Sequence, residues 1–266
     1  VLWSRLHGKK VVYSIANDVD CVQELPALKP FRERFLYKYG LMNCDSIICQ
    51  TEKQRQLLMD EYGLVAEVIR MPCEGFPKNR SDHAKSKNNE KKHILWAGRF
   101  TPEKRLEYFF ELAKLFPDMI FDVIGDYNFE KDTSYANELK QLAEGIDNVV
   151  LHGRVPHEKM GEYFNKSYLL CSTSVYEGFP NIYLEAWSVG LPLVTTFDPD
   201  GVVREFGLGR IAHDVETLRT AVAGLLSEAD WEKAASAAES YFFNHHTLSS
   251  SMTRFEGAFK EPNPLE

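Results

Sequence analysis

Two acidic side chains in one short segment have the chemistry and the spacing to bind a sugar. Glu177 and Glu185 lie eight positions apart in the segment YEGFPNIYLEAW, residues 176–187, with a Gly-Phe-Pro-Asn turn and an apolar run between them. An ionised carboxylate only accepts hydrogen bonds and can take two donors at once, which matches sugar hydroxyls. The turn leads into a predicted helix, whose first backbone N–H groups and positive dipole end favour a phosphate. A sugar and a phosphate bound side by side predict a nucleotide-sugar ligand.

The two glutamates have different predicted roles. If the helix begins near Asn181, Glu185 lies one turn into it, on the side where the ribose of a bound nucleotide would be. Glu177 lies in the preceding turn, close to the hexose. The alternative is a pair of surface acids that flank an apolar helix.

A second loop, GRFTPEK at residues 98–104, offers positive charge. Gly98 allows a tight turn, Arg99 can bind two phosphate oxygens with its forked guanidinium group, and Lys104 adds a point charge. Both cations come just before or within the first turn of a predicted helix, which already favours anions. The alternative is a solvated loop with two ordinary surface cations.

A third loop follows another predicted strand and contains Gly153, Arg154 and Val155. A glycine lets a ligand approach the backbone closely, so this loop could pair with the edge of a nucleobase. The alternative is a plain turn between a strand and a helix.

Strands and helices alternate along the chain. The sequence predicts strands at 10–15, 45–50, 65–70, 93–97, 120–124, 149–152, 168–172, 193–196 and 210–212. It predicts helices at 31–42, 52–62, 102–116, 135–144, 157–165, from 181 onward, and at 216–226 and 229–241. This alternation is typical of an α/β fold with a Rossmann-like parallel sheet and helices on both faces. The glycine-bearing loops would then meet at the carboxyl ends of the strands, where such sheets bind ligands.

The segment 78–92 contains no large apolar residue and cannot contribute to a core, so it is predicted to be a linker. It separates a partial N-terminal α/β domain, residues 1–77, from a nucleotide-sugar donor-binding domain with C-terminal helices, residues 93–266. The net charge of −8 is uneven: residues 1–92 carry +4 and residues 93–266 carry −12. The acidic part argues against nucleic acid as a partner. The basic part could face an anionic membrane.

The remaining composition indicates where the protein works. Five cysteines, an odd number without CxxC spacing, indicate reduced structural thiols. No apolar run reaches eighteen residues, so a cytoplasmic protein is expected, with peripheral membrane contact as a further expectation. The basic and aromatic helix at 29–39 is either an ordinary amphipathic helix or a membrane-surface contact.

The segment Asp18-Val19-Asp20 resembles a metal motif of an unrelated fold, and no metal site is expected there. Asn17 and Asp18 are candidates for contact with an acceptor, the molecule that would receive a sugar.

The segment EGFPNIYLEAWSVGLPLVTT, together with ILWAGRFTPEKR upstream, resembles the donor-binding domain of glycosyltransferase family 4. The resemblance covers residues 93–266 and implies a retaining hexosyltransferase of the GT-B fold that needs no metal or other cofactor. By the resemblance, Arg99 and Lys104 hold the donor diphosphate, Glu177 contacts the transferred sugar, and Glu185 binds the ribose. The backbone of the turn is implied to contact sugar and phosphate, through Gly178, Phe179, Pro180, Asn181 and Ile182.

The resemblance further implies a UDP-, GDP- or ADP-sugar donor and a glycan or lipid-linked acceptor. Residues 1–92 correspond only to the last part of the family's N-terminal domain, and Ala16 stands where the family often has a histidine. Two other functions therefore stay open. One is a non-catalytic nucleotide-sugar-binding module, and the other is a sugar-nucleotide epimerase of the same fold.

Overall fold

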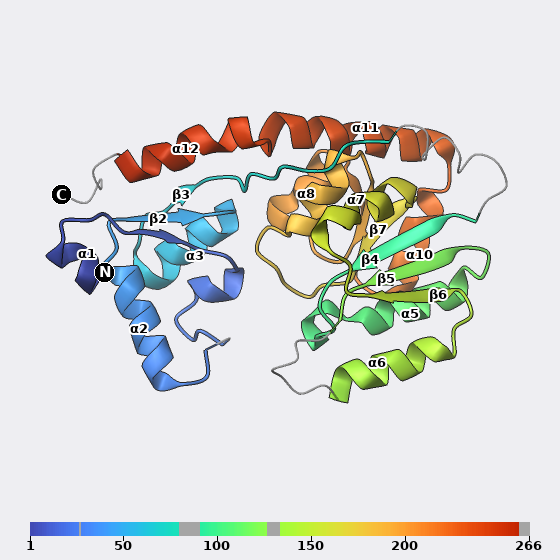
Figure 1. Ribbon diagram of the computed structural model, residues 1–266, viewed down its shortest axis with the longest axis horizontal. Helices are drawn as coiled ribbons and strands as arrows, with labels where there is room; N and C mark the ends of the chain where they lie inside the picture. Colours follow the sequence, from blue (N-terminus) through green and yellow to red (C-terminus); the bar gives the residue numbers. More distant parts are fainter. Residues whose placement is uncertain (27, 80–90, 127–133, 261–266) are drawn as a thin grey trace. The chain divides into compact units, whose positions relative to one another are not determined.

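The computed structural model describes residues 1–26, 28–79, 91–126 and 134–260, and it forms two compact units (Figure 1). The first unit contains Val1–Cys73, Glu177–Pro180 and the C-terminal residues from His245. The second contains Glu74–Tyr176 and Asn181–Asn244. Each unit has its own parallel sheet with helices packed on it, which confirms the predicted α/β class.

The first unit is built on a sheet of described strands in the order β1-β2-β3. Its strands are β1 (Val12–Ser14), β2 (Ser46–Cys49) and β3 (Glu67–Val68). Its helices are α1 (Leu2–Leu6), η1 (Asp18–Cys21), α2 (Phe31–Met42), α3 (Glu52–Tyr62) and α12 (Leu248–Lys260). The predicted boundaries of α3 are confirmed: Thr51 Oγ1 accepts a hydrogen bond from the Gln54 N–H at 3.1 Å, and Gly63 ends the helix with φ of +66°.

The second unit is built on a larger sheet of described strands in the order β6-β5-β4-β7-β8-β9, all parallel. Its strands are β4 (His93–Ala97), β5 (Ile120–Ile124), β6 (Val149–Gly153), β7 (Leu169–Ser172), β8 (Leu193–Thr195) and β9 (Gly209–Ile211). Its helices are η2 (Pro102–Lys104), α5 (Leu106–Leu115), α6 (Ser134–Glu144), α7 (His157–Lys166), α8 (Asn181–Ser188), η3 (Pro199–Gly201), α9 (Val202–Glu205), α10 (Val215–Gly224) and α11 (Glu228–His245). The central strands are almost wholly apolar because both faces of the sheet are covered.

The order of the strands places a topological switch point between β4 and β7. From β4 the chain adds β5 and β6 on one side, and then returns to add β7, β8 and β9 on the other side. The connections that leave β4 and β7 therefore diverge, and open α/β sheets bind their ligands at the carboxyl ends of the strands at such a point. The loops that follow β4 and β7 are the GRFTPEK and YEGFPN segments.

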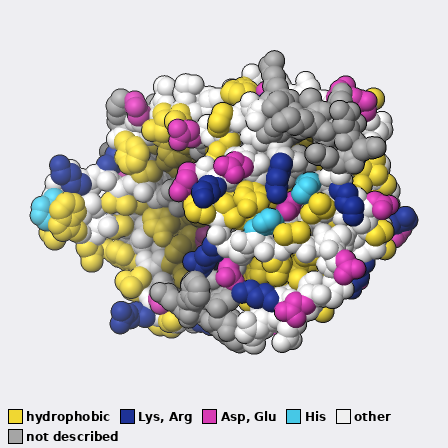
Figure 2. Space-filling model, turned by 45° about the vertical axis from the view of Figure 1, so that its right-hand side comes forward, with side chains coloured by type: hydrophobic (Ala, Val, Ile, Leu, Met, Phe, Trp, Pro, Cys, Tyr) yellow, Lys and Arg dark blue, Asp and Glu magenta, His cyan; other side chains and the backbone are white. Residues whose placement is uncertain are grey.

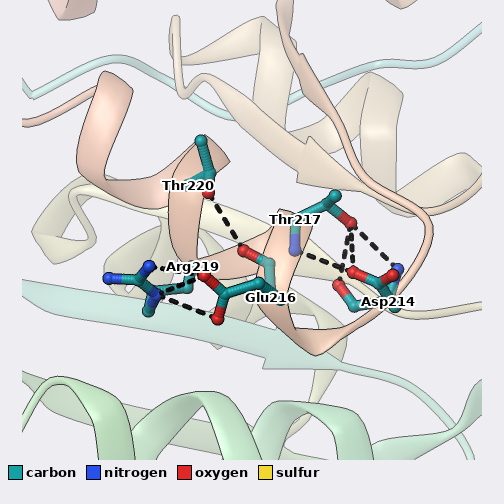
Figure 3. A network of polar contacts seen from close by, with 5 residues as sticks. All are labelled: Asp214, Glu216, Thr217, Arg219 and Thr220. Atoms are coloured by element: carbon teal, nitrogen blue, oxygen red, sulfur yellow. Dashed lines mark hydrogen bonds and ion pairs between the residues drawn. The ribbon is translucent and has the colours of Figure 1, made fainter.

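Capping side chains fix the start of α10, which packs against α5, β8 and β9. Asp214 Oδ1 accepts from the Thr217 N–H at 2.8 Å, and Thr217 Oγ1 accepts from the Asp214 N–H at 3.0 Å (Figure 3). Arg219 pairs with Glu216 one turn along the same helix (Figure 3). The reciprocal hydrogen bonds between Asp214 and Thr217 satisfy two backbone N–H donors at the start of this helix.

Some elements differ from the prediction. The helix predicted at 102–116 is two helices, η2 and α5, separated by Arg105 in the left-handed conformation. The last helix, α12, was not predicted, and it packs on the first unit, where Ala258 and Phe255 lie with Ile48 and Ile69. Assigning all of 93–266 to one domain therefore differs from the structure, which places 177–180 and the residues from 245 in the first unit. Most of the predicted linker, 80–90, lies outside the described residues.

A buried carboxylate stabilises the β4–β6 side of the second unit. Asp122 in β5 accepts from His93 Nδ1 and from His152 Nε2, each at 2.5 Å, and Lys166 Nζ lies 3.6 Å away. Burial raises the pKa of Asp122, but the hydrogen bonds from His93 and His152 outweigh it and leave the pKa below its ordinary value. Histidine side chains appear beside acidic and basic ones on the face drawn in Figure 2. The imidazole and ammonium groups compensate the charge of an otherwise isolated buried acid.

Candidate functional site

The loop that follows β4 is anchored by its backbone and presents a cation. The Gly98 N–H donates to the Ile124 carbonyl at 3.0 Å, and the Phe100 N–H donates to the Asp126 carbonyl at 3.1 Å. Phe100 is buried, so it holds the loop in place, whereas Arg99 between these two anchors is exposed. Lys104 is half-buried at the end of η2.

Three glycines bring the loops after β4, β5 and β6 together. The Gly125 N–H donates to the Gly153 carbonyl at 2.8 Å, and a Cβ atom at Gly125 would lie 1.8 Å from the Gly98 carbonyl oxygen. Only glycine fits at position 125, where φ is +132°. The predicted phosphate loop and the predicted base loop are therefore adjacent at one edge of the sheet, with Arg154 exposed and Val155 half-buried.

The loop that follows β7 is bonded to the loop that carries Lys104. The Val175 N–H donates to the Glu103 carbonyl at 2.8 Å, and Thr173 Oγ1 donates to the Lys104 carbonyl at 2.6 Å. The two loops that flank the switch point thus hold each other. This places Lys104 beside the segment that leads to Glu177 and on to α8, which begins at the predicted Asn181 and Ile182.

Glu185 lies in α8, and its side chain is 14% exposed. His157 Nε2 donates to Glu185 Oε1 at 3.0 Å. Burial raises the pKa of Glu185, and the hydrogen bond from His157 partly offsets this by favouring the carboxylate. His157 is the first residue of α7, directly after the loop that carries Gly153, so it links this loop to the predicted ribose acid. No local sequence signal marks His157, because its partner lies 28 residues away.

Residues Glu177–Pro180 belong to the first unit, where the turn is tightly packed. The Phe179 N–H donates to Gln50 Oε1 at 2.8 Å, and a Cβ atom at Gly178 would lie 2.1 Å from the Ala16 carbonyl oxygen. Packing therefore requires a glycine at position 178. The Phe179 N–H, predicted to contact the donor, has a protein acceptor in this structure.

The Asp-x-Asp motif has a structural role in the first unit. Asp18 is 7% exposed, pairs with Lys53 at 2.7 Å, and accepts from Gln54 Nε2 at 3.2 Å. The Val19 N–H donates to the side chain of Asn17, which caps η1. No group of three or more His, Cys, Asp or Glu side chains within the described residues could hold a metal ion.

A pocket lies at the other edge of the large sheet. It has a volume of about 670 Å³ and is lined by Lys91, Lys114, Asp147, Asn148 and apolar residues near the amino ends of β5 and β6. None of the predicted site residues lines it. Lys114 pairs with Glu111, and the Asn148 amide donates to three backbone carbonyls, so these polar groups serve the fold. We place the candidate site at the carboxyl edge instead.

The sequence that forms this edge matches a known family of sugar-transferring enzymes. The model of the family "Glycosyl transferases group 1" matches residues 77–239, more than half of the chain. The chain belongs to this family. The match includes the loops after β4, β6 and β7 and all the residues predicted above for the donor site.

Individual members of the group 1 family show the same relationship. The chain is 28% identical over 201 residues to mannosylfructose-phosphate synthase of Agrobacterium fabrum, covering 68% of this chain and 44% of the relative. It is 33% identical over 110 residues to lipopolysaccharide 1,6-galactosyltransferase of Salmonella typhimurium, covering 39% of this chain and 29% of the relative. The chain spans less than half the length of each of these two relatives.

Solved structures share the fold. Anabaena Alr3699/HepE, crystallised with UDP and glucose, matches with a TM-score of 0.78 at 15% identity. The match covers 97% of this chain and 73% of the Anabaena chain. Sucrose-phosphate synthase of Thermosynechococcus elongatus has a TM-score of 0.79 at 16% identity and covers 97% of this chain and 70% of its own. These neighbours are GT-B glycosyltransferases, so the predicted fold is confirmed.

Proposed function

We propose that the protein is a retaining glycosyltransferase that moves a sugar from a nucleotide-diphosphate sugar to a glycan or lipid-linked acceptor. The observation that carries this proposal is the pair of bonded loops at the switch point, one with Arg99 and Lys104 and the other leading to α8 and Glu185. Family membership supports a glycosyltransferase, and the UDP bound to the Anabaena neighbour supports a nucleotide donor.

In the proposed reaction the bond between the sugar C1 and the donor phosphate oxygen breaks. Arg99, Lys104 and the N-terminus of α8 stabilise the negative charge that develops on the leaving diphosphate. An acceptor hydroxyl oxygen bonds to C1 from the face that the phosphate leaves, and its proton passes to a donor phosphate oxygen. Glu177 would orient the sugar and Glu185 the ribose.

Binding measurements test this assignment. A thermal-shift screen against UDP, GDP, ADP and their sugars identifies the nucleotide, because a ligand that binds the native state raises its melting temperature. We then expect Arg99→Ala and Lys104→Ala each to weaken binding of that nucleoside diphosphate by about 1.5–3 kcal/mol, the range for hydrogen bonds to charged groups. Calorimetry measures the change.

Arg219→Ala is the matched control, because Arg219 is an exposed arginine whose partner Glu216 lies on the same helix. Its nucleotide affinity should equal that of the unchanged protein. Unchanged affinity in both the Arg99 and the Lys104 variants would overturn the proposed site.

We further propose that the first unit contacts an anionic membrane surface. The apolar side chains of α2 do not all pack inward: Phe31 is 83% exposed, and Phe35, Leu36 and Met42 are exposed as well. Helix α1 exposes Leu2, Trp3 and Leu6, and its Arg5 bonds to Asn43 at the end of α2.

Basic side chains accompany these apolar ones. The same part of the sequence contains the exposed residues Lys9, Lys10, Lys29 and Arg32. Apolar and basic side chains together favour an anionic bilayer surface. No described helix is long and apolar enough to cross a membrane.

A further inference from the structure

Arg105 has a backbone conformation that its residue type rarely adopts. Its φ is +45° and its ψ is 51°, in the left-handed region that glycine and asparagine favour. It lies between Lys104, the last residue of η2, and Leu106, the first residue of α5. A long side chain at this position indicates that its contacts compensate for the unfavourable backbone.

The guanidinium group of Arg105 binds the ends of two strands. Nε donates to the Thr173 carbonyl at 2.8 Å, and Nη2 donates to the Ser174 carbonyl at 3.4 Å and to Thr196 Oγ1 at 2.9 Å. Thr173 and Ser174 follow β7, and Thr196 follows β8. The group also lies 4.6 Å from the centre of the Tyr108 ring. One side chain therefore fixes the loops after β7 and β8 to the residue that follows Lys104.

The loop after β7 also binds the backbone of Lys104 directly. Thr173 Oγ1 donates to the Lys104 carbonyl at 2.6 Å and accepts from Trp96 Nε1 at 3.0 Å. Thr173 is fully buried and Ser174 is 3% exposed, so these bonds are shielded from water. Shielding strengthens a hydrogen bond and makes its loss costly. The backbone of Lys104 thus has little freedom as long as Arg105 and Thr173 keep their contacts.

We propose that Arg105 is a positioning residue for nucleoside diphosphate binding. It fixes the Lys104 backbone against the Thr173–Tyr176 loop, so that the Lys104 side chain starts from a fixed point when the diphosphate arrives. This inference rests on the proposed function and deepens it, because it names a residue that acts through Lys104. A group held in its binding position before the ligand arrives loses less conformational entropy on binding.

A double-mutant cycle with Lys104 tests the role. The probes are UDP, GDP and ADP, each compared with its nucleoside. Dissociation constants are measured for the unchanged protein, Arg105→Ala, Lys104→Ala and the double variant. We expect Arg105→Ala to weaken diphosphate binding about tenfold. This corresponds to the loss of one charge-assisted hydrogen bond, the bond proposed between Lys104 and the diphosphate. Nucleoside affinity should not change, because in the proposed site Lys104 binds the diphosphate and not the nucleoside. In the Lys104→Ala background, Arg105→Ala should have no further effect.

A second variant keeps the test decisive if Arg105→Ala does not fold. Thr196→Val keeps arginine at position 105 and removes one acceptor of its guanidinium group, together with the hydrogen bond from Thr196 Oγ1 to the Ser174 carbonyl at 2.8 Å. It should weaken diphosphate binding about threefold, less than the loss of the whole side chain, and only while Lys104 is present. Arg204→Ala is the control, because Arg204 is an exposed arginine of the same unit.

The outcomes separate the two proposals. If the unchanged protein binds none of UDP, GDP and ADP, the proposed function fails and the positioning role fails with it. If it binds one of them, and the Arg105 or Thr196 variant binds diphosphate as tightly as the unchanged protein, only the positioning role is overturned. Equal losses for diphosphate and nucleoside, or additive losses with Lys104→Ala, would also overturn it.

Discussion

At the scale of single residues, Glu185 lies in an environment that makes its charge sensitive to pH. Burial raises the pKa of its carboxyl group, and the hydrogen bond from His157 opposes that rise. Under the proposed function the carboxylate accepts hydrogen bonds from ribose hydroxyls, which requires the ionised form. An acid with a raised pKa takes up its proton at a higher pH than an ordinary glutamate. As the pH is lowered, nucleotide affinity should therefore begin to fall at a higher pH than it would if Glu185 were an exposed glutamate.

Removal of His157 should move this transition. In His157→Ala the pKa of Glu185 loses the contact that lowers it, so the carboxyl group is protonated at a higher pH. We expect the midpoint of the affinity loss to shift upward while affinity well above the midpoint changes little. Calorimetry with the nucleoside diphosphate across the acidic to neutral range measures the midpoint.

His213→Ala serves as the control, because His213 is exposed and precedes α10, and its backbone N–H donates to Thr217 Oγ1 rather than to Glu185. A midpoint that stays in place in His157→Ala, or that shifts equally in both variants, would contradict the account of Glu185.

The sequence identified Glu185, Arg99 and Lys104 as candidates but not the residues that position them. Carboxylates and cations near a turn are visible as residue types at a spacing, and the family motif adds their order. His157 acts on a partner 28 residues away, and Arg105 acts on partners 68 and 91 residues away, so their roles depend on how helices and loops pack. The assignment of Glu177 to the sugar and Glu185 to the ribose stays a prediction.

At the scale of elements, most strands and helices were predicted because each has a clear local signal. The buried β7 and β8 are short apolar runs, and α3 has both a threonine cap and a glycine stop. The break at Arg105 has no such signal, since arginine is a good helix former and only its tertiary hydrogen bonds stabilise the left-handed turn. Helix α12 begins with three serines in its first turn, and its packing on Ile48 and Ile69 stabilises it.

The exposed apolar side of α2 leads to a prediction of its own. We expect the double change Phe31→Ser and Phe35→Ser to reduce binding to phosphatidylserine-containing vesicles severalfold, because each aromatic side chain contributes apolar area at the bilayer surface. The unchanged protein should bind these vesicles less at high salt, since the basic residues contribute electrostatically. Co-sedimentation measures the bound fraction.

Phe243→Ser provides the control for this experiment. Phe243 is also exposed, but it lies on α11 in the second unit, so its loss should not reduce vesicle binding. Equal binding by the unchanged protein and the double variant would remove α2 from the proposed membrane contact.

At the scale of the whole molecule, the α/β class followed from the alternation of strands and helices, and the structure confirms it. The assignment of residues to units did not follow, because it depends on contacts between distant segments. The residues from 245 onward continue the second unit in sequence but pack on β2 of the first, through Ala258 and Ile48. Composition cannot reveal such a return, whereas it can reveal a polar segment such as 78–92.

The central claim is that the loops after β4 and β7 bind the diphosphate of a nucleotide-sugar. The most direct test is a crystal structure of this chain with the nucleoside diphosphate that the thermal-shift screen selects. The account predicts the diphosphate within hydrogen-bond distance of Arg99 and Lys104, and the ribose hydroxyls at Glu185. An ordered nucleotide bound elsewhere, for example in the pocket with Lys91 and Lys114 at the amino ends of the strands, would contradict it.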